Sequence, residues 1–305
     1  MHDDRSRALE TTLWYPTADK LDPTEQIYPS GFLGYATRDA KPLKPRERLP
    51  LILLSHGDKG QSEYLAWLAE RLAENGYLVA GMNHWRNTTL NNEHEETVRL
   101  WHRPQDLSFV LTELIADPSW GQRIDPNRIG VAGHSSGGYT AFALAGAIYD
   151  VEAMAAYCQS SQRGPDCDLA QEADFKKIDF TAASESYRDH RIRASFAMAP
   201  AAGNAIRSSS LAEISISVYV VTTRHDELLD PALNAIRYAE ETPGSTLTIE
   251  EEGGHFVYLS RCSLISKVFT YFLEVDACGT HSSVDRNAVQ QRLSHQALAF
   301  FNQNL

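Results

Sequence analysis

The sequence predicts an α/β fold, with a mostly parallel central sheet and helices on both of its faces. Two observations predict it. Apolar, β-branched stretches alternate along the chain with stretches of helical periodicity. Several of the apolar stretches are also continuously apolar, as strands covered on both faces are. The composition agrees, because 43% hydrophobic and 22% charged residues are ordinary globular values. We expect residues 1–305 to form a single domain.

Six segments are predicted as strands because turn residues bound them and β-branched or aromatic residues are enriched within them. They are Leu51–Ser55, Tyr77–Gly81, Arg128–Ala132, Ala194–Met198, Ser217–Val221 and Thr246–Glu250. A further segment, Thr11–Tyr15, is expected to add an antiparallel strand at one edge of the sheet.

Helices are predicted between these strands and after the last one. They are Glu63–Asn75, Pro104–Ala116, Gly137–Tyr149, Pro231–Glu241, Phe256–Leu273 and a closing helix over Ser282–Leu305. In the first, Leu65, Leu68 and Leu72 recur on one face. Strands and helices that alternate in this way imply right-handed crossover connections.

Residues 150–190 do not follow the alternation, because they are polar and separate a helix from the next strand. A segment of about 40 residues buries too little surface to hold a core of its own. We therefore expect an excursion over the edge of the sheet, and analogy with other folds suggests that it acts as a partial lid.

The charge balance limits the partners of the chain. With 28 Lys and Arg against 40 Asp and Glu, the formal net charge is −12. Such a surface repels phosphate backbones and anionic lipid, so we expect no nucleic-acid partner. No apolar run approaches the roughly 18 residues of a membrane span, so we expect no stable membrane insertion. The start, Met1–Arg5, lacks the apolar core of a secretory leader.

Four cysteines occur at spacings that match no zinc site. Cys158 and Cys167 lie in the polar excursion, and Cys262 and Cys278 flank an apolar segment. Four cysteines allow three pairings, and all four could also be reduced in a cytoplasmic protein. Their positions favour two local disulfides, each closing a short loop. This pairing predicts a periplasmic or secreted protein whose leader is absent from the sequence.

The strongest chemical motif is Gly133-His134-Ser135-Ser136-Gly137, which follows a predicted strand and begins a predicted helix. A G-x-S-x-G nucleophile elbow requires this context. The residues two before and two after the serine must be small so that strand and helix can approach. Ser135 is then the expected nucleophile, at the positive end of the helix dipole.

A serine hydroxyl needs a base, and the base needs an orienting acid. His255 follows the last predicted strand after two glycines, which is the position of the base in this chain order. Asp226 follows the strand Ser217–Val221 and is the expected acid. Glu227 and Asp230 compete for that role, although Asp230 before Pro231 fits a helix cap better.

Two backbone amides are expected to bind the oxyanion that forms in the reaction. One belongs to Ser136, the residue after the nucleophile. The other comes from the loop after the first predicted parallel strand, where Asp58 follows Ser55-His56-Gly57.

A group of histidines and glutamates in residues 83–103 matches no pattern of metal ligands, so we interpret it as a solvated loop. We expect neither a metal nor a cofactor. The group comprises His84, His94, His102, Glu93, Glu95 and Glu96.

With these residues in place, the chain resembles α/β-hydrolases of the dienelactone-hydrolase-like group, near the platelet-activating-factor acetylhydrolases. Further motifs carry the resemblance from about residue 10 to residue 300. They are Trp14-Tyr15-Pro16, Arg103-Pro104-Gln105-Asp106, Ala197-Met198-Ala199-Pro200, His225-Asp226-Glu227, Gly254-His255-Phe256, and Cys262 with Cys278. The resemblance implies a metal-free serine esterase from a group whose members are often exported.

Two departures from the family pattern matter. Dienelactone hydrolases proper use a cysteine nucleophile, whereas position 135 is serine, so lactone specificity does not transfer. Animal acetylhydrolases place the acid after the preceding strand. Here that strand runs into Met198–Gly203 without a carboxylate, which supports Asp226.

The function expected from the sequence is a carboxylic ester hydrolase that cleaves a small-molecule ester through an acyl-enzyme. Two alternatives remain. An amidase or peptidase would use the same scaffold, because the sequence does not reveal the leaving group. A non-catalytic binding protein on a hydrolase fold would lack a reactive serine.

Overall fold

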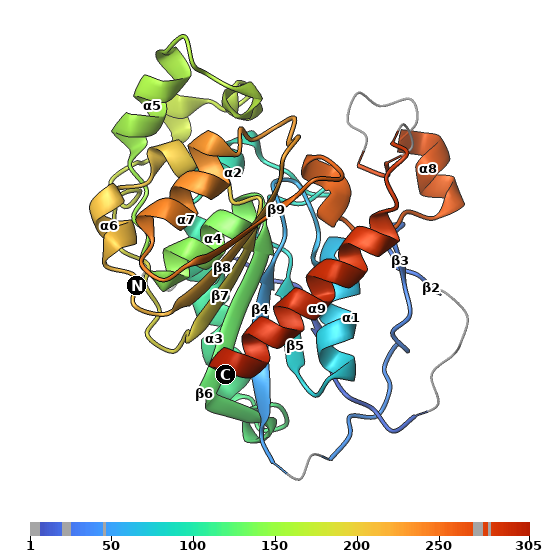
Figure 1. Cartoon of the computed structure of the whole chain (residues 1–305). Helices are drawn as coiled ribbons and strands as arrows, with labels where there is room; N and C mark the ends of the chain where they lie inside the picture. The colour runs from blue at the N-terminus through green and yellow to red at the C-terminus, as the bar shows by residue number, and fades with distance from the viewer. Residues whose placement is uncertain (1–6, 20–25, 45–46, 271–276, 280–281) are drawn as a thin grey trace.

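The computed structural model describes residues 7–19, 26–44, 47–270, 277–279 and 282–305 (Figure 1). Two predictions fall outside the described residues. They are the one about a leader at Met1–Arg5 and the one about the last residues of the helix Phe256–Leu273.

A seven-stranded sheet, in the order β1-β5-β4-β6-β7-β8-β9, forms the centre of the fold. All neighbouring pairs are parallel except β1 with β5, which confirms the predicted sheet and its antiparallel edge. The strands are β1 (Thr11–Trp14), β4 (Leu49–Ser55), β5 (Leu78–Met82), β6 (Ile124–His134), β7 (Ala194–Met198), β8 (Ser217–Thr223) and β9 (Thr246–Glu250). A separate small ribbon, β2 (Gln26–Ile27) with β3 (Leu33–Gly34), was not predicted.

The order of the strands creates a switch point between β4 and β6. From β4 the chain moves outward to β5, and it then returns to β6 on the other side of β4. Ser55, the last residue of β4, pairs in register with Gly133 near the end of β6. Open parallel sheets form a crevice outside the carboxyl ends of strands at such a point. Both the Ser55–Asp58 loop and Ser135 follow these strand ends.

Helices cover both faces of the sheet. Ile52 and Leu54 of β4 pack in a core with α1 and α9, whereas Leu51 and Leu53 pack in another with α3 and α4. Figure 1 shows α9, in red, crossing in front of the sheet. The helices are α1 (Ala66–Glu74), α2 (His94–Val98), α3 (His102–Ala116), α4 (Ser136–Ala145), α5 (Val151–Gln159), α6 (Ser208–Ala212), α7 (Arg237–Glu241), α8 (Leu264–Thr270) and α9 (Arg286–Asn304).

Short 3₁₀ and π turns join these elements. They are η1 (Ser62–Leu65), η2 (Gly121–Arg123), η3 (Pro165–Ala170), η4 (Phe175–Lys177), η5 (Gly203–Ala205), the π-helical η6 (Ala232–Ile236) and η7 (His255–Tyr258).

The predicted helix over Phe256–Leu273 is wrong in its first part. After η7 the chain is irregular, and α8 begins only at Leu264. Tertiary hydrogen bonds hold this intervening segment in place of helical ones. The Ser260 amide donates to the Tyr64 carbonyl at 2.6 Å, and Cys262 forms an antiparallel bridge with Phe32.

The excursion at residues 150–190 contains α5, η3 and η4 and lies above α4 and α7 in Figure 1. Its residues Ala173, Ile178 and Ala183 are buried in the core that also holds Phe142 of α4. Glu172 Oε2 lies 2.9 Å from the Nδ1 atom of His94 in α2. The excursion therefore packs on α2 as well as on the main core.

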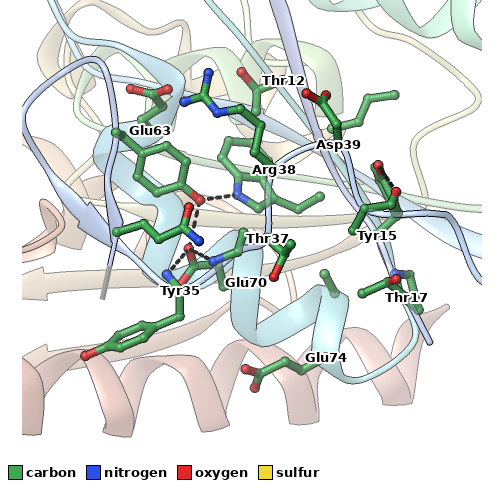
Figure 2. A pocket seen from close by; sticks show the side chains of 18 of the residues that line it. Thr12, Tyr15, Thr17, Tyr35, Thr37, Arg38, Asp39, Glu63, Glu70 and Glu74 are labelled. Carbon is green, nitrogen blue, oxygen red and sulfur yellow. Dashed lines mark hydrogen bonds between the residues drawn. The ribbon is translucent and has the colours of Figure 1, made fainter. Parts of the chain in front are cut away.

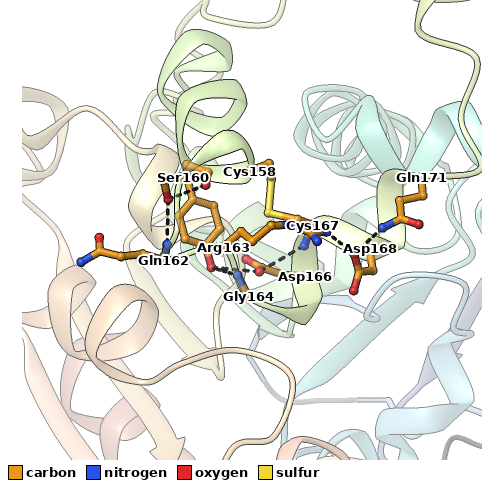
Figure 3. The surroundings of a disulfide bond; sticks show 10 residues. Cys158, Ser160, Gln162, Arg163, Gly164, Asp166, Cys167, Asp168 and Gln171 are labelled. Carbon is orange, nitrogen blue, oxygen red and sulfur yellow. Dashed lines mark hydrogen bonds and ion pairs between the residues drawn. A yellow bond between two sulfur atoms is a disulfide. The ribbon is translucent and has the colours of Figure 1, made fainter.

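The four cysteines form the two local disulfides that their positions favoured. Cys158 pairs with Cys167, and Cys262 pairs with Cys278. Figure 3 shows the first bond, which ties the end of α5 to η3 beside Asp166. The Tyr157 hydroxyl donates to Asp166 Oδ1 at 3.1 Å in the same place.

No helix within the described residues combines the length and the apolar character that a crossing of the bilayer would require.

Candidate active site

Ser135 lies in a strained turn between β6 and α4. Its backbone has φ 57° and ψ −121°, a region that residues other than glycine rarely occupy. The turn is possible because its neighbours are small. A Cβ atom at Gly133 would lie 2.2 Å from the Gly137 carbonyl oxygen, and one at Gly137 would lie 2.0 Å from the Ser55 carbonyl oxygen. Strand, turn and the end of β4 are thus in direct backbone contact.

The segment after β7 holds the backbone of this turn. The Ser135 amide donates to the Met198 carbonyl at 2.9 Å, and the Ala201 amide donates to the Ser135 carbonyl at 3.1 Å. A Cβ atom at Gly138 would lie 2.7 Å from the Cα atom of Pro200. These contacts offset the strain, because the surroundings leave the chain no relaxed alternative.

His255 and Asp226 lie side by side, one in η7 and the other after β8. His255 Nδ1 is 2.8 Å from Asp226 Oδ2, and both side chains are buried. The Leu228 and Leu229 amides donate to Asp226 Oδ1 at 3.0 and 2.7 Å. The carboxylate is therefore fixed by backbone donors on one oxygen and holds the imidazole with the other.

His134, the residue before Ser135, links the turn to His255. The two rings are 4.7 Å apart between centroids, and His134 Nε2 donates to the His255 carbonyl at 2.9 Å. Burial holds the pKa of His134 well below its usual range, and nearby His255 lowers it further. A neutral His134 can donate from Nε2 without placing a second charge beside His255.

The two competing carboxylates have other contacts. Glu227 Oε2 accepts from the His255 backbone amide at 2.8 Å. Gly254 makes room for it, since a Cβ atom there would lie 2.0 Å from Glu227 Oε2. Asp230 Oδ1 accepts from the Ala232 amide at 2.9 Å, at the start of η6. Of the three acids, Asp226 is the one hydrogen-bonded to the imidazole of His255.

The loop after β4 runs directly past Ser135. A Cβ atom at Gly57 would lie 3.2 Å from Ser135 Cβ. Ser136 is the first residue of α4, so its amide has no acceptor within the helix. The next residue of the loop, Asp58, accepts at Oδ1 from Asn87 Nδ2 at 2.7 Å and from Thr97 Oγ1 at 2.9 Å.

Residues 83–103 are not the solvated loop that we expected. His84 and Glu96 are buried, and the chain forms α2 within this segment. His84 contacts Asp106, while Glu96 accepts from Arg99 and His102. These hydrogen bonds compensate for the burial of the polar groups. Among the residues that the structure describes, no three His, Cys, Asp or Glu side chains are grouped as a metal site.

Two cavities lie outside the Ser135 turn. One of about 810 Å³ is bounded by β1, residues 26–43 and α1, and Figure 2 shows its carboxylates Glu63, Glu70 and Glu74. Glu70 accepts there from the Tyr28 hydroxyl at 2.8 Å and from the Tyr35 amide at 2.9 Å. It thereby ties residues 28–36 to α1. The other, of about 640 Å³, adjoins the His255 loop.

Sequence reasoning missed the contacts that surround these candidate residues. The Arg103-Pro104-Gln105-Asp106 motif contributes only to the family resemblance in the sequence, yet Arg103 and Asp106 are buried behind the loop after β4. Arg103 and Asp106 stand three residues apart at the start of a run of helical periodicity, in phase with Leu107 and Val110, and this placement on the apolar face could have suggested burial. Nothing in the sequence indicated that Asn87 and Thr97 contact Asp58.

The chain has the fold of an α/β-hydrolase. The chain superposes on a ferulic acid esterase from Streptomyces cinnamoneus with a TM-score of 0.62 and 20% identity, over 98% of this chain and 83% of that one. At this identity the likeness concerns the fold alone.

Residues 28–98 match the family model of platelet-activating factor acetylhydrolase, isoform II. Cutinase est1 of Thermobifida alba is 35% identical over 102 residues, which are 33% of this chain and 32% of the cutinase. Cutinase 2 of Thermobifida cellulosilytica is 34% identical over 104 residues, 33% of this chain and 36% of that one. The matches span about a third of these curated relatives.

Proposed function

We propose that the protein is a serine ester hydrolase with Ser135 as nucleophile, His255 as general base and Asp226 as the orienting acid. The observation that carries the proposal is the strained Ser135 turn beside the buried His255–Asp226 pair. Strain of this kind is retained where the surroundings enforce it, and it often marks a reacting residue. The partial matches to cutinases and to an acetylhydrolase family favour an ester as the substrate.

In the proposed reaction, Ser135 Oγ attacks the ester carbonyl carbon while His255 Nε2 takes its proton. The amides of Ser136 and Asp58 stabilise the oxyanion of the tetrahedral intermediate. Collapse expels the alcohol, which takes the proton from His255 and leaves an acyl group on Ser135. Water then attacks the acyl carbon, with His255 again as base, and releases the acid.

The position of Asp226 determines which nitrogen of His255 carries a proton. Because Nδ1 donates to the carboxylate, Nε2 has its lone pair free for the serine proton. Asp226 also stabilises the imidazolium that forms during attack.

The direct test is hydrolysis of p-nitrophenyl butyrate by the purified protein. We expect turnover by the wild-type chain and loss of at least about a thousandfold in Ser135→Ala, because the nucleophile is gone. Labelling by a fluorophosphonate should occur in the wild type and not in Ser135→Ala. Unchanged turnover in the variant would exclude Ser135 as the nucleophile.

The substrate panel should include the matching p-nitroanilide. Faster cleavage of the anilide than of the ester would indicate an amidase instead. Failure of both substrates together with failure of fluorophosphonate labelling would indicate a binding protein.

The same proposal places the protein in an oxidising compartment, the periplasm or the extracellular space. It rests on the two disulfides, since structural disulfides persist where thiols are not kept reduced.

A further inference from the structure

A second chain of polar side chains lies behind the proposed site, and it is fully buried. Ser55 Oγ is 2.9 Å from His84 Nε2, and His84 Nδ1 is 3.1 Å from Asp106 Oδ2. The three residues have the order of a catalytic triad, but Ser55 has no exposed surface. A substrate cannot reach it. Ser55, His84 and Asp106 therefore have a role other than nucleophilic attack on a substrate.

The proton positions along this chain follow from its contacts. His84 Nδ1 donates to Asp106, which leaves Nε2 to accept from the Ser55 hydroxyl. The His84 backbone amide donates to His56 Nε2 at 3.1 Å, so the proton of the His56 ring is on Nδ1. That nitrogen donates to the Gly57 carbonyl at 2.6 Å. Burial, followed by the charge of Arg103, lowers the pKa of His56 to about 3, in keeping with this neutral form.

Arg103 extends the network to the two residues after Ser55. Its guanidinium is buried and donates to the His56 carbonyl, and Nη1 donates to Asn87 Oδ1 at 2.6 Å. The amide nitrogen of Asn87 in turn donates to Asp58 Oδ1. Thr97 supplies a second donor to that oxygen. Arg103 Nη2 also lies 3.5 Å from the Gly57 carbonyl oxygen, so each residue from Ser55 to Asp58 is contacted by a side chain or amide of residues 84–106.

We propose that Asn87, Thr97 and Arg103 are positioning residues that aim the Asp58 backbone amide at the oxyanion. The inference rests on the proposed function and deepens it. The geometry supports it because Asn87 and Thr97 bind the Asp58 side chain, while Arg103 binds the carbonyl two residues earlier. Together they fix the rotation of the two peptides between His56 and Asp58. None of the three needs to touch the substrate.

An oxyanion donor must point at the position that the oxygen occupies in the tetrahedral state. A positioning role therefore predicts a loss in kcat rather than in ground-state binding. Removal of one such donor costs about 10²–10³ in kcat, so a misaimed donor should cost about 10–100-fold. KM should change by less than about threefold.

The decisive variants form a matched set that changes the two side chains bound to Asp58. Thr97→Val removes the hydroxyl and keeps the shape, whereas Thr97→Ser keeps the hydroxyl. We expect kcat for p-nitrophenyl butyrate to fall about fivefold or more in Thr97→Val, and to recover to within about twofold of wild type in Thr97→Ser. Asn87→Ala combined with Thr97→Val should lower kcat by about 10–100-fold.

A second measurement distinguishes a misoriented Asp58 amide from a nonspecific loss of activity. An alkyl boronic acid adds to the serine and forms a tetrahedral anion, so its inhibition constant should weaken by the same factor as kcat. The control is Ser108→Ala, because Ser108 lies on α3 near Asp106 but donates to Asp189. It should leave kcat and boronate affinity within about twofold of wild type.

Three results would overturn the inference. The first is an equal kcat in Thr97→Val and Thr97→Ser. This comparison uses two conservative substitutions, so it does not depend on a destabilised variant. The second is a fall in kcat with unchanged boronate affinity, and the third is a loss confined to KM. If the wild type itself does not hydrolyse the ester, or Ser135→Ala keeps its activity, the proposed function fails first.

Discussion

The backbone of Ser135 is held in a conformation that costs on the order of 1–3 kcal/mol, and three glycines make it possible. Gly133, Gly137 and Gly138 each contact backbone or proline atoms at distances that a Cβ atom could not share. These three glycines are required because they have no side chain, and not because their backbone has a positive φ. The turn is therefore intolerant of a single methyl group.

Gly137→Ala tests this intolerance. Its Cβ atom would lie 2.0 Å from the Ser55 carbonyl oxygen, so the strand end and the turn must separate. We expect a loss of about 1–3 kcal/mol in the free energy of unfolding and of at least about 100-fold in kcat, since small misplacements of reacting groups are costly. Urea unfolding and p-nitrophenyl butyrate turnover measure the two effects.

Gly76→Ala is the matched control. Gly76 has φ 92° with no atom within 4 Å of a Cβ, so the methyl group strains only its own backbone. It should lose a similar stability with kcat unchanged. Full activity in Gly137→Ala would show that the turn tolerates the methyl group.

The candidate residues that the sequence indicates are those whose proposed role depends on local sequence. Ser135 follows a strand and precedes a helix, and Asp226 and His255 follow strand ends, so each position is defined by its own neighbours. Asn87, Thr97 and Arg103 could not be predicted, because their contacts to residues 56–58 cross 29 to 47 positions of sequence. Such contacts depend on how elements pack. No local pattern encodes them.

At the scale of elements, strands were easier to predict than the helix after His255. β7 and β9 have the predicted bounds. β7 is buried throughout, as strands inside a parallel sheet are, whereas β9 lies at the edge of the sheet and its apolar residues alternate with threonines. The segment after Tyr258 has helical periodicity, yet its backbone forms hydrogen bonds with Tyr64, Leu33 and Gly31 instead. Tertiary contacts override propensity where a short segment has good partners elsewhere.

The disulfides can be tested by a thiol count. Without reductant, the denatured protein should show no reactive thiol, and after reduction it should show four, because both pairs are bonded. A count of four before reduction would contradict both bonds and the proposed compartment.

Removal of the longer link should also lower stability. Cys262→Ser with Cys278→Ser opens a loop of 16 residues, for which the chain-entropy relation gives about 3 kcal/mol. The pair Cys158→Ser with Cys167→Ser is the comparison, since its shorter loop should contribute slightly less.

At the scale of the whole molecule, burial of neutral imidazoles makes the fold sensitive to acid. Burial holds the pKa of His84 and of His134 well below the usual range and lowers that of His56 to about 3. In the unfolded chain these rings take up protons below about pH 6.5, and in the folded chain they do not. Their contribution to stability is present above that pH and is lost as the pH falls.

Asp106 acts in the opposite sense. Burial raises its pKa to about 7, so between about pH 4 and 6.5 the folded state holds one proton that the unfolded state has lost. Three protons favour unfolding and one opposes it. Among these four groups, folding therefore excludes more protons than it holds, and the free energy of unfolding should decline as the pH falls below about 6.

Urea unfolding at pH 5, 6 and 8 measures this slope. The variant His190→Gln serves as the control, because His190 is exposed and its replacement should leave the slope unchanged. A free energy of unfolding that stays level between pH 5 and 6 would show that the three rings are protonated within the fold.

His255 is held at two points by two consecutive acids, its ring by Asp226 and its backbone amide by Glu227. The loss of rotational freedom that fixes a side chain, up to about 1–2 kcal/mol, is therefore incurred when the chain folds and not when a substrate arrives. The free energy of substrate binding need not order the ring. In entropic terms, the proposed base is immobilised in advance.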